Sequence, residues 1–269
     1  MRSKTLGIMA AALLAVALFA ASAQAATPKP GYTQFAGCPS LEENPNTGFC
    51  VRTTITGGHF QMGSKDVPIT NPMVLSGGID VNNGNFIYNS KGGLTGGKQK
   101  VPGGVVGLTG LTWLLEILGS EALTLYAQTE LAGTAKELLS EPNYLPIKVR
   151  LINSVLGNNC YVGSNSNPIL LKLITKTTSP PPPNMPITGK EPEQSVDEAL
   201  SIFHFNNGEY VDNSFSAPGA SGCVLTLFGF IPISINGLVN AQSGLPAPAG
   251  TNETRQKFNA EATPVFLVY

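Results

Sequence analysis

The chain has few charged residues and few of the side chains that catalytic and metal sites commonly use. Only 12% of its 269 residues are Asp, Glu, Lys or Arg, and it has two histidines and one tryptophan. With 16 basic and 17 acidic residues, it lacks the concentrated basic face that nucleic-acid binding requires. No C-x-x-C spacing or histidine pair accompanies the four cysteines, which argues against a zinc site. We therefore expect no nucleic-acid partner, no bound metal and no cofactor.

Three stretches come close to known functional motifs and miss them. GGLTGGKQ at 92–99 satisfies G-x-x-x-x-G-K, but Gln99 stands where a phosphate-binding loop has the Ser or Thr that holds magnesium. DVNNGN from Asp80 has its glycine one residue too early for a calcium loop, and Lys91 replaces the final glutamate. GASGC around Ser221 lacks the last glycine of a nucleophile elbow. We interpret all three as turns or loops.

The remaining candidate side chains have structural interpretations. His59 and His204 each lie within a strand-like run, and Trp113 lies in an apolar stretch that predicts core packing. Glycosidase chemistry needs two carboxylates at a set separation, and the sequence singles out no such pair. The acidic residues in loop contexts are expected on the solvated surface: Glu42, Glu43, Glu191, Glu193, Asp197 and Glu198. The sequence therefore names no catalytic residue.

Residues 1–25 predict a signal peptide. Arg2 and Lys4 form a basic start, residues 6–21 are almost wholly apolar, and the small residues Ala23 and Ala25 fit a cleavage site. Cleavage would leave 26–269 as a single secreted β-rich domain with no transmembrane segment. It removes two of the 16 basic residues and none of the 17 acidic ones, so the net charge moves from −1 to −3.

Four cysteines in an exported chain predict two disulfides, for which three pairings are possible. CPSLEENPNTGFC makes Cys38–Cys50 a natural local loop, which leaves Cys160 to pair with Cys223. On chain entropy the short loop would contribute roughly 3 kcal/mol and the long one roughly 4 kcal/mol to stability. Cys160 sits inside the turn-forming stretch LGNNCYVGSNSNP, so this pairing would hold a loop to a distant segment.

Composition and periodicity predict a mainly β fold. The chain has 30 Gly and 21 Pro, which favour short strands and many turns. Apolar and polar residues alternate in 145–151, 123–131 and 258–262, as in half-buried strands. We expect antiparallel sheets in a sandwich- or barrel-like arrangement, with short helices at 111–121 and 232–242.

Turn signals divide these strands. Asn-Gly at 83–84 and at 207–208 stands between apolar runs and predicts two hairpins with type I′ turns. The proline-rich stretch 179–194 predicts an exposed loop, and the glycine-rich stretch 92–110 predicts another.

The same series of short patterns occurs twice, which predicts internal repeats at 50–140 and 148–269. Each series has an Asn-Pro before an apolar strand, then Asn-Asn-Gly followed by Asn-Ser, then a Pro-Gly before a candidate helix. The proline-rich stretch would be an insertion in the second copy, and the copies would form one pseudo-symmetric sandwich or barrel. The alternative is that a β-rich chain simply reuses the same turn residues.

The stretches PIKVRLINSVLGNNCYVGSNSNPILLKL (146–173) and VDNSFSAPGASGC (211–223) resemble segments of an uncharacterised family of secreted actinobacterial proteins. The likeness extends over most of the chain from about Cys38 onward. That family has no assigned activity. The resemblance therefore implies an exported, disulfide-bearing envelope or extracellular protein and supplies no catalytic residues.

Together these features favour an exported, non-enzymatic protein of the cell envelope or extracellular space, with a structural or binding role and a cell-wall polymer or a lipid as its partner. Two alternatives remain open. One is a secreted hydrolase that acts on polysaccharide or ester, which needs paired acids or a Ser–His pair in a cleft. The other is a carrier of apolar ligands, whose mark would be a sizeable closed apolar cavity.

Overall fold

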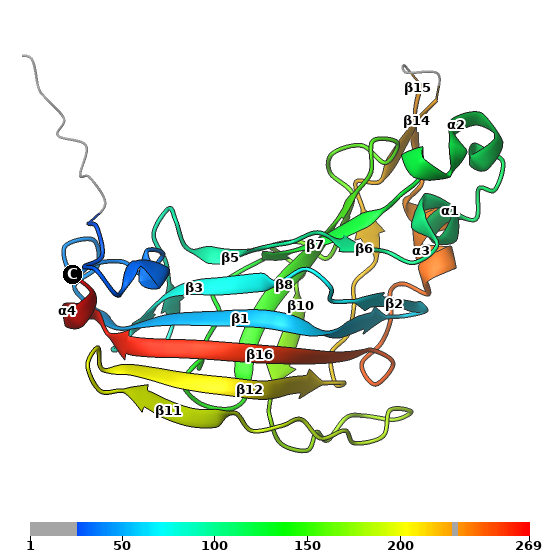
Figure 1. Cartoon of the computed structure of the whole chain (residues 1–269). Helices are drawn as coiled ribbons and strands as arrows, with labels where there is room; N and C mark the ends of the chain where they lie inside the picture. Colours follow the sequence, from blue (N-terminus) through cyan, green and yellow to red (C-terminus); the bar gives the residue numbers. More distant parts are fainter. Residues whose placement is uncertain (1–25, 228–230) are drawn as a thin grey trace, which may run out of the picture.

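Two antiparallel β-sheets hold most of the strands in the computed structural model, which describes residues 26–227 and 231–269 (Figure 1). Strands make up 43% of the chain and helices 12%, so the predicted mainly β fold with antiparallel sheets is confirmed, and the arrangement is sandwich-like. The predicted signal peptide, residues 1–25, lies outside the described residues.

The first sheet, called the large sheet below, has eight strands. Its order is β11-β12-β16-β1-β3-β4, with β2 paired to β1 and β5 paired to β3. The long strands β1, β16 and β12 run side by side through its middle (Figure 1). The bounds are β1 (Thr47–Met62), β2 (Lys65–Pro68), β3 (Met73–Asp80), β4 (Phe86–Ile87), β5 (Gly93–Gly96), β11 (Glu193–Asp197), β12 (Ile202–Asp212) and β16 (Glu253–Pro264).

The second sheet, called the small sheet, has six strands in the order β13-β9-β8-β7-β6, with β10 also paired to β8. A separate pair, β14 (Val224–Leu227) and β15 (Ile231–Ser234), forms a two-stranded hairpin. The small-sheet bounds are β6 (Gln99–Lys100), β7 (Tyr126–Leu131), β8 (Asn143–Ile152), β9 (Tyr161–Val162), β10 (Ile169–Leu173) and β13 (Ala220–Ser221).

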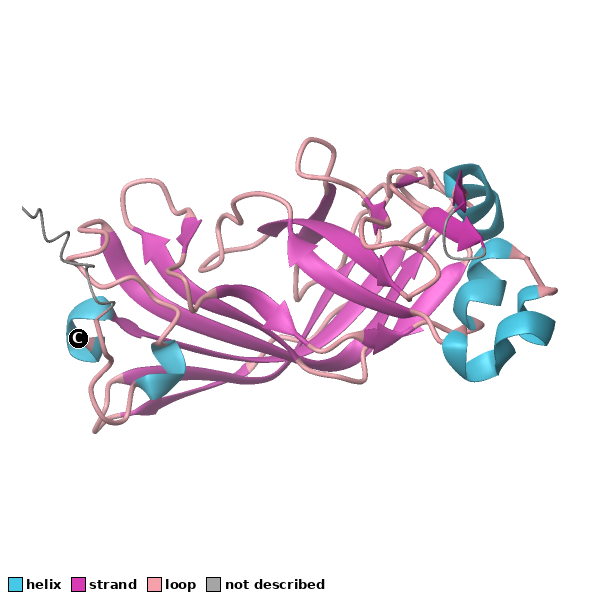
Figure 2. Cartoon of the chain, turned by 90° about the horizontal axis from the view of Figure 1, so that it is seen from above, coloured by secondary structure: helices cyan, strands magenta, loops and turns pink. Residues whose placement is uncertain are grey.

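The helices are short and lie at the two ends of the molecule. α1, α2 and α3 lie together at one end of the molecule, and α4 lies with η1 at the other (Figures 1 and 2). Among the described residues, no helix has the length and the apolar character needed to cross a membrane. The bounds are η1 (Thr33–Phe35), α1 (Gly104–Thr109), α2 (Leu114–Ala122), α3 (Asn236–Ser243) and α4 (Val265–Val268).

Both sheets turn an apolar face toward one shared core. Val51 and Leu75 come from the large sheet, and Ile147 and Val149 from the small sheet; all four are buried in the same cluster. The alternation predicted for 145–151 is present with one exception: Leu145, Ile147, Val149 and Leu151 are buried as expected, and Pro146 between the first two is buried as well. A strand that buries alternate residues stabilises the sheet through removal of apolar surface from water.

The hairpin predicted at 83–84 is present, but its turn is longer than expected. β3 and β4 are antiparallel, and five residues connect them. Gly84 has a positive φ of 68°, while Asn83 does not, so this is not a type I′ turn. Instead the Asp80 carboxylate accepts a hydrogen bond from the backbone N–H of Asn82 at 2.8 Å and caps the turn.

The prediction of a hairpin turn at 207–208 is wrong. Both residues lie inside β12, where the register against β16 slips between Phe205 and Gly208. Asn207 adopts a positive φ of 58° within this bulge. The glycine serves a packing need, because a Cβ on Gly208 would lie 2.4 Å from the ring of Phe258. The Asn-Gly pair therefore marks a bulge within a strand and not a turn between two strands.

Other local predictions are partly corrected. The helix predicted at 232–242 begins only at Asn236, because Pro232 belongs to β15. The helix expected at 111–121 is observed as α2, shifted toward the C-terminus. The glycine-rich stretch 92–110 is not one loop, since it contains β5, β6 and α1. The proline-rich stretch 179–194 is an exposed or half-buried loop up to the start of β11, as predicted.

Both predicted disulfides are confirmed. Cys38 is bonded to Cys50, and Cys160 is bonded to Cys223. The second bond joins the residue just before β9 to the residue just before β14. It therefore fastens the base of the β14–β15 hairpin to the small sheet, which is the role of the cysteine in the loop 156–168.

The two halves of the chain share a pairing pattern, although the duplication itself stays a prediction. β1 pairs with β3 through its first half and β2 through its second half, and β8 pairs likewise with β10 and then β9. The last strand of each half pairs with a strand of the other half. β7, the last strand of the first half, pairs with β8, and β16, the last strand of the second half, pairs with β1. Each sheet is therefore assembled from both halves of the sequence.

Candidate functional site

A cleft enters the molecule between the two sheets and ends in a small inner cavity. The inner cavity has a volume of about 50 Å³ and the outer cleft about 450 Å³. Both are lined by Thr53, Leu138, Asn143 and Tyr210, so the cleft and the cavity adjoin each other. The two parts are treated below as one site.

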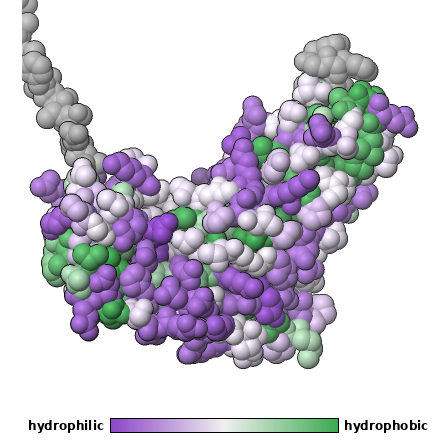
Figure 3. All heavy atoms as spheres, in the orientation of Figure 1, coloured by the Kyte–Doolittle hydropathy of each residue, from purple (hydrophilic) through white to green (hydrophobic). Residues whose placement is uncertain are grey.

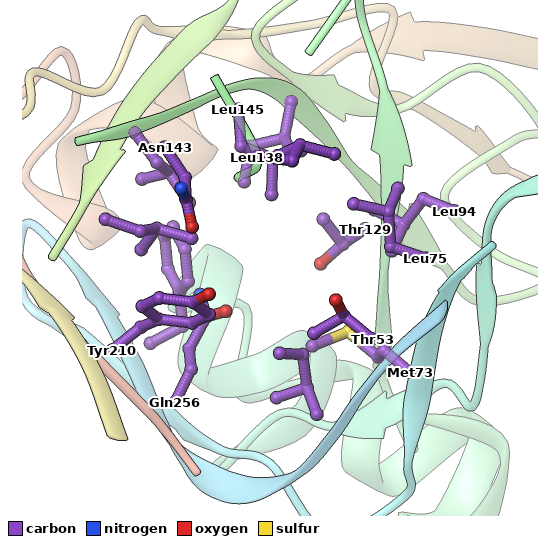
Figure 4. Close-up of a pocket in the computed structure, with 15 residues that line it drawn as sticks. Thr53, Met73, Leu75, Leu94, Thr129, Leu138, Asn143, Leu145, Tyr210 and Gln256 are labelled. Atoms are coloured by element: carbon purple, nitrogen blue, oxygen red, sulfur yellow. The ribbon is translucent and has the colours of Figure 1, made fainter. Parts of the chain in front are cut away.

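The wall of the inner cavity is mostly aliphatic and comes from both sheets (Figure 4). The large sheet supplies Met73 and Leu75 from β3, and the small sheet supplies Leu145 from β8 and Leu171 from β10. These residues lie here because alternate positions on each strand face the space between the sheets. The wall therefore offers apolar surface to whatever enters.

Five polar side chains interrupt this apolar wall: Thr53, Thr129, Asn143, Tyr210 and Gln256 (Figure 4). Asn143 uses its Nδ2 to donate to the carbonyls of Glu137 and Ser140, which fixes the orientation of the amide. Within the described residues, its Oδ1 has no hydrogen-bond partner.

Gln256 shows the same arrangement from the large sheet. Its Nε2 donates to Thr254 Oγ1 at 3.2 Å, and its Oε1 has no partner within the described part of the chain. Gln256 and Asn143 are both buried residues. Neither oxygen is among the fully buried atoms that lack a partner, and both residues line the cavity, so both oxygens are available to accept a hydrogen bond from a bound group.

Tyr210 supplies a donor. Its ring stacks on Phe258 from β16, with the ring centroids 3.8 Å apart and the planes within 7°. Burial raises the pKa of the Tyr210 hydroxyl above its ordinary value of 10.0, and the Glu141 carboxylate adds to the rise. The hydroxyl is therefore protonated at neutral pH and can donate to a ligand oxygen, but it does not act as a base.

Charged side chains are confined to the outer cleft. Glu141 accepts hydrogen bonds from the backbone N–H of Thr175 at 2.8 Å and from its Oγ1 at 2.6 Å, which ties the loop before β8 to the end of β10. Lys176 and Glu191 are exposed at the mouth. Among the described residues that line the inner cavity, none carries a charge. The site is thus apolar and neutral inside and charged only at its entrance.

Neither of the histidines considered from the sequence lines this site, although His204 contacts Glu261, which lines the outer cleft. Both are in strands of the large sheet, as predicted. His59 Nδ1 is 2.8 Å from Asp66 Oδ1, and His204 Nδ1 is 3.5 Å from Glu261 Oε1. On β16 they pair with residues six positions apart, or about 20 Å along the strand, so they do not form one centre.

The other singled-out residues have structural roles or exposed positions. Gln99 organises its loop by accepting hydrogen bonds from the N–H groups of Thr70 and Asn71 at 2.8 and 3.0 Å. The six carboxylates are exposed as predicted, except that Asp197 is half-buried, and the loop context is wrong for Glu193 and Asp197, which begin and end β11. The prediction that Trp113 packs in the core is wrong. Trp113 directly precedes α2, and its side chain is 41% exposed. The described residues contain no group of three or more His, Cys, Asp or Glu that could hold a metal ion.

Sequence reasoning missed the residues that do converge. Gln256 occupies an inward position of β16, between the buried residues Thr254 and Phe258. Asn143 begins β8 and is buried among apolar neighbours. A polar residue at an inward position of an alternating strand is the sequence signal for both.

A scan against protein-family models, a search of curated proteins and a search of solved structures each found no match for this chain. The assignment of function therefore depends on the site alone.

Proposed function

We propose that the protein is an exported, non-enzymatic binding protein that holds a small amphipathic molecule in the cleft between its two sheets. The observation that carries the proposal is the inner cavity, where an aliphatic wall surrounds unpaired neutral hydrogen-bonding groups. Export is supported by the predicted signal peptide, by the resemblance to secreted proteins and by two disulfides, which are typical of oxidising compartments.

The chemistry of the cavity indicates the class of ligand. Tyr210 can donate a hydrogen bond, while Asn143 Oδ1 and Gln256 Oε1 can accept one. A hydroxyl group both donates and accepts, so it satisfies these groups without bringing a charge into an apolar space. The preferred ligand is a lipid-like molecule with a hydroxyl at the end that enters the inner cavity.

The size of the site agrees with this class. The outer cleft, at about 450 Å³, falls within the range of small-molecule pockets, roughly 300 to 1,000 Å³. The inner cavity alone holds only a short end group. The hydroxyl end therefore occupies the inner cavity, and the apolar body fills the cleft along Leu138 and Phe258.

The test compares two adjacent threonines of β1. Thr53 lines the site, whereas Thr54 does not line it and pairs with the exposed Asn259 of β16. The probe is N-phenyl-1-naphthylamine, an uncharged apolar dye whose fluorescence rises on transfer out of water, displaced by a long-chain alcohol. We expect Thr53→Phe to fill the cleft and weaken dye binding by at least about tenfold, or about 1.4 kcal/mol.

Thr54→Phe is the matched control and should bind the dye as the parent protein does. Failure of the parent protein to bind the dye or the alcohol would contradict the proposal. So would equal binding by the two variants, provided that both melt cooperatively.

A further inference from the structure

One end of the molecule exposes an apolar surface that the cleft does not use. It is formed by six residues, called the arm tip here: Trp113, Leu115, Ile117 and Leu118 around the start of α2, with Ile231 and Ile233 of β15. Ile117 is 67% exposed, and the others are between 40% and 44% exposed. Hydrophobic residues gather on this part of the surface in Figure 3. Such a cluster marks an interaction site more often than scattered single residues do.

The arm tip belongs to a projecting part of the molecule, called the arm, which is formed by residues 101–125 and 223–243. These two segments carry almost no charge. Residues 101–125 contain two acidic residues, Glu116 and Glu121, and no Lys or Arg, while residues 223–243 contain no charged residue. This contrasts with the large sheet, where charged pairs such as Arg52–Glu261 and Arg255–Glu209 lie between strands. The arm tip is therefore matched to an uncharged, apolar partner.

The exposed residues are held outward by buried neighbours. Leu114 is buried and fixes the start of α2, while Leu225 is buried and fixes β14. The bond between Cys160 and Cys223 fastens the base of the hairpin. A two-stranded hairpin is marginally stable by itself in water, so these anchors are what maintain its position. The arm tip is thus a built feature rather than a frayed end.

The position of the arm suits contact with an extended surface. It projects from the sheets, at the opposite end from α4 and the C-terminus (Figure 1). The described N-terminal segment lies beside the C-terminus, since the Lys29 N–H donates to the Val268 carbonyl at 2.8 Å. Neither the start of the described chain nor its end stands between the arm tip and a surface that it approaches.

We propose that the arm tip inserts into the surface of a lipid bilayer. A bilayer accepts a projecting apolar surface without shape matching or directional hydrogen bonds, whereas a protein interface normally has a polar rim that forms them. Trp113 suits the boundary between headgroups and acyl chains, where tryptophan is enriched in membrane proteins. Insertion is shallow and buries the side chains of α2 and β15 while the sheets stay in water.

The charges predict which bilayer is bound. The arm segments contain no basic residue, and the two lysines against them, Lys65 on the Gly107 carbonyl and Lys100 beside residue 101, are offset by Glu116 and Glu121. Net attraction to anionic lipids is therefore small. Binding is therefore expected on pure phosphatidylcholine, unaffected by salt and no stronger when phosphatidylglycerol is added. This pattern distinguishes apolar insertion from electrostatic adsorption, which salt screens.

The first experiment uses the only tryptophan of the chain as a reporter. The disulfide-bonded protein is titrated with phosphatidylcholine vesicles, and Trp113 emission should shift to shorter wavelength as the side chain leaves water. Vesicles with brominated acyl chains should quench this emission. This fluorescence measurement uses the parent protein, so it does not depend on the folding of a variant.

The second experiment compares vesicle flotation of two double variants. We expect Ile117→Ser with Ile233→Ser to lower the fraction bound by at least about tenfold, because two inserted apolar side chains are lost. The control, Val196→Ser with Met185→Ser, removes exposed apolar side chains from β11 and the proline-rich loop and should bind as the parent does.

Several outcomes would overturn the proposal. These are an absence of binding to phosphatidylcholine, a requirement for anionic lipid, or equal binding by the two double variants. Lipid-independent self-association that disappears with Ile117→Ser and Ile233→Ser, without vesicle binding, would assign the arm tip to a second copy of the chain. Thr53→Phe should still bind vesicles, which separates this proposal from the cleft.

Discussion

The floor of the cleft depends on a single residue without a side chain. Gly208 leaves the space that the Phe258 ring occupies, and Phe258 in turn stacks on Tyr210. Any larger residue at 208 would displace the ring and move the Tyr210 hydroxyl that faces the cavity. The β12 bulge ends at this glycine, with Asn207 at a positive φ of 58°, so the bend of β12 lies beside the position that leaves room for the Phe258 ring.

Burial of Tyr210 also predicts how stability changes in alkali. Its pKa is raised in the folded protein, chiefly by burial and then by Glu141. Above about pH 10 the tyrosine ionises in the unfolded chain but stays neutral in the folded one, so the free energy of unfolding falls. Tyr210→Phe removes this contribution. We expect that variant to lose less stability than the parent protein between about pH 9 and about pH 11, measured by urea unfolding.

The control for this prediction is Tyr88→Phe, which alters an exposed tyrosine. It should lose stability in alkali as the parent does. An identical pH dependence for the two variants would show that Tyr210 is not the group responsible.

At the scale of elements, local periodicity predicted strands better than it predicted their partners. Alternation in β8 and β16 could be seen in the sequence because it depends only on neighbouring residues. The pairing of β1 with β16 joins residues about 200 positions apart, and no local pattern encodes it. The cleft was missed for the same reason, since Thr53, Asn143 and Gln256 meet only after both sheets have formed.

The disulfides differ in the element that each one supports, and this can be measured. Cys160→Ser with Cys223→Ser should lower the free energy of unfolding by up to about 4 kcal/mol and speed amide hydrogen exchange in β14 and β15. Cys38→Ser with Cys50→Ser should cost up to about 3 kcal/mol and leave exchange in the arm unchanged, because this bond lies at the opposite end. Equal exchange in the arm of both variants would contradict the role assigned to Cys160.

For the whole molecule, the exchange of final strands makes the two halves of the chain depend on each other. The large sheet needs β16 from the second half beside β1, and the small sheet needs β7 from the first half beside β8. Both sheets bury their apolar faces in the same core. The internal duplication stays a prediction, and neither half of the chain holds all the strands of one sheet.

This arrangement predicts that neither half folds alone. In a fragment of residues 26–140, β1 keeps β2 and β3 but loses β16 from its other edge. In a fragment of residues 141–269, β8 keeps β9 and β10 but loses β7. Each fragment keeps its own disulfide, so no covalent bond is broken by the division. We expect each fragment to lack a cooperative thermal transition by circular dichroism. Without the missing strand and the shared core, the remaining contacts do not offset the entropy lost when the chain is ordered.

Mixing the fragments should restore the transition. Dye binding should return with it, because residues from both fragments line the cleft. A cooperative transition in either fragment alone would instead show that each half is an independent folding unit.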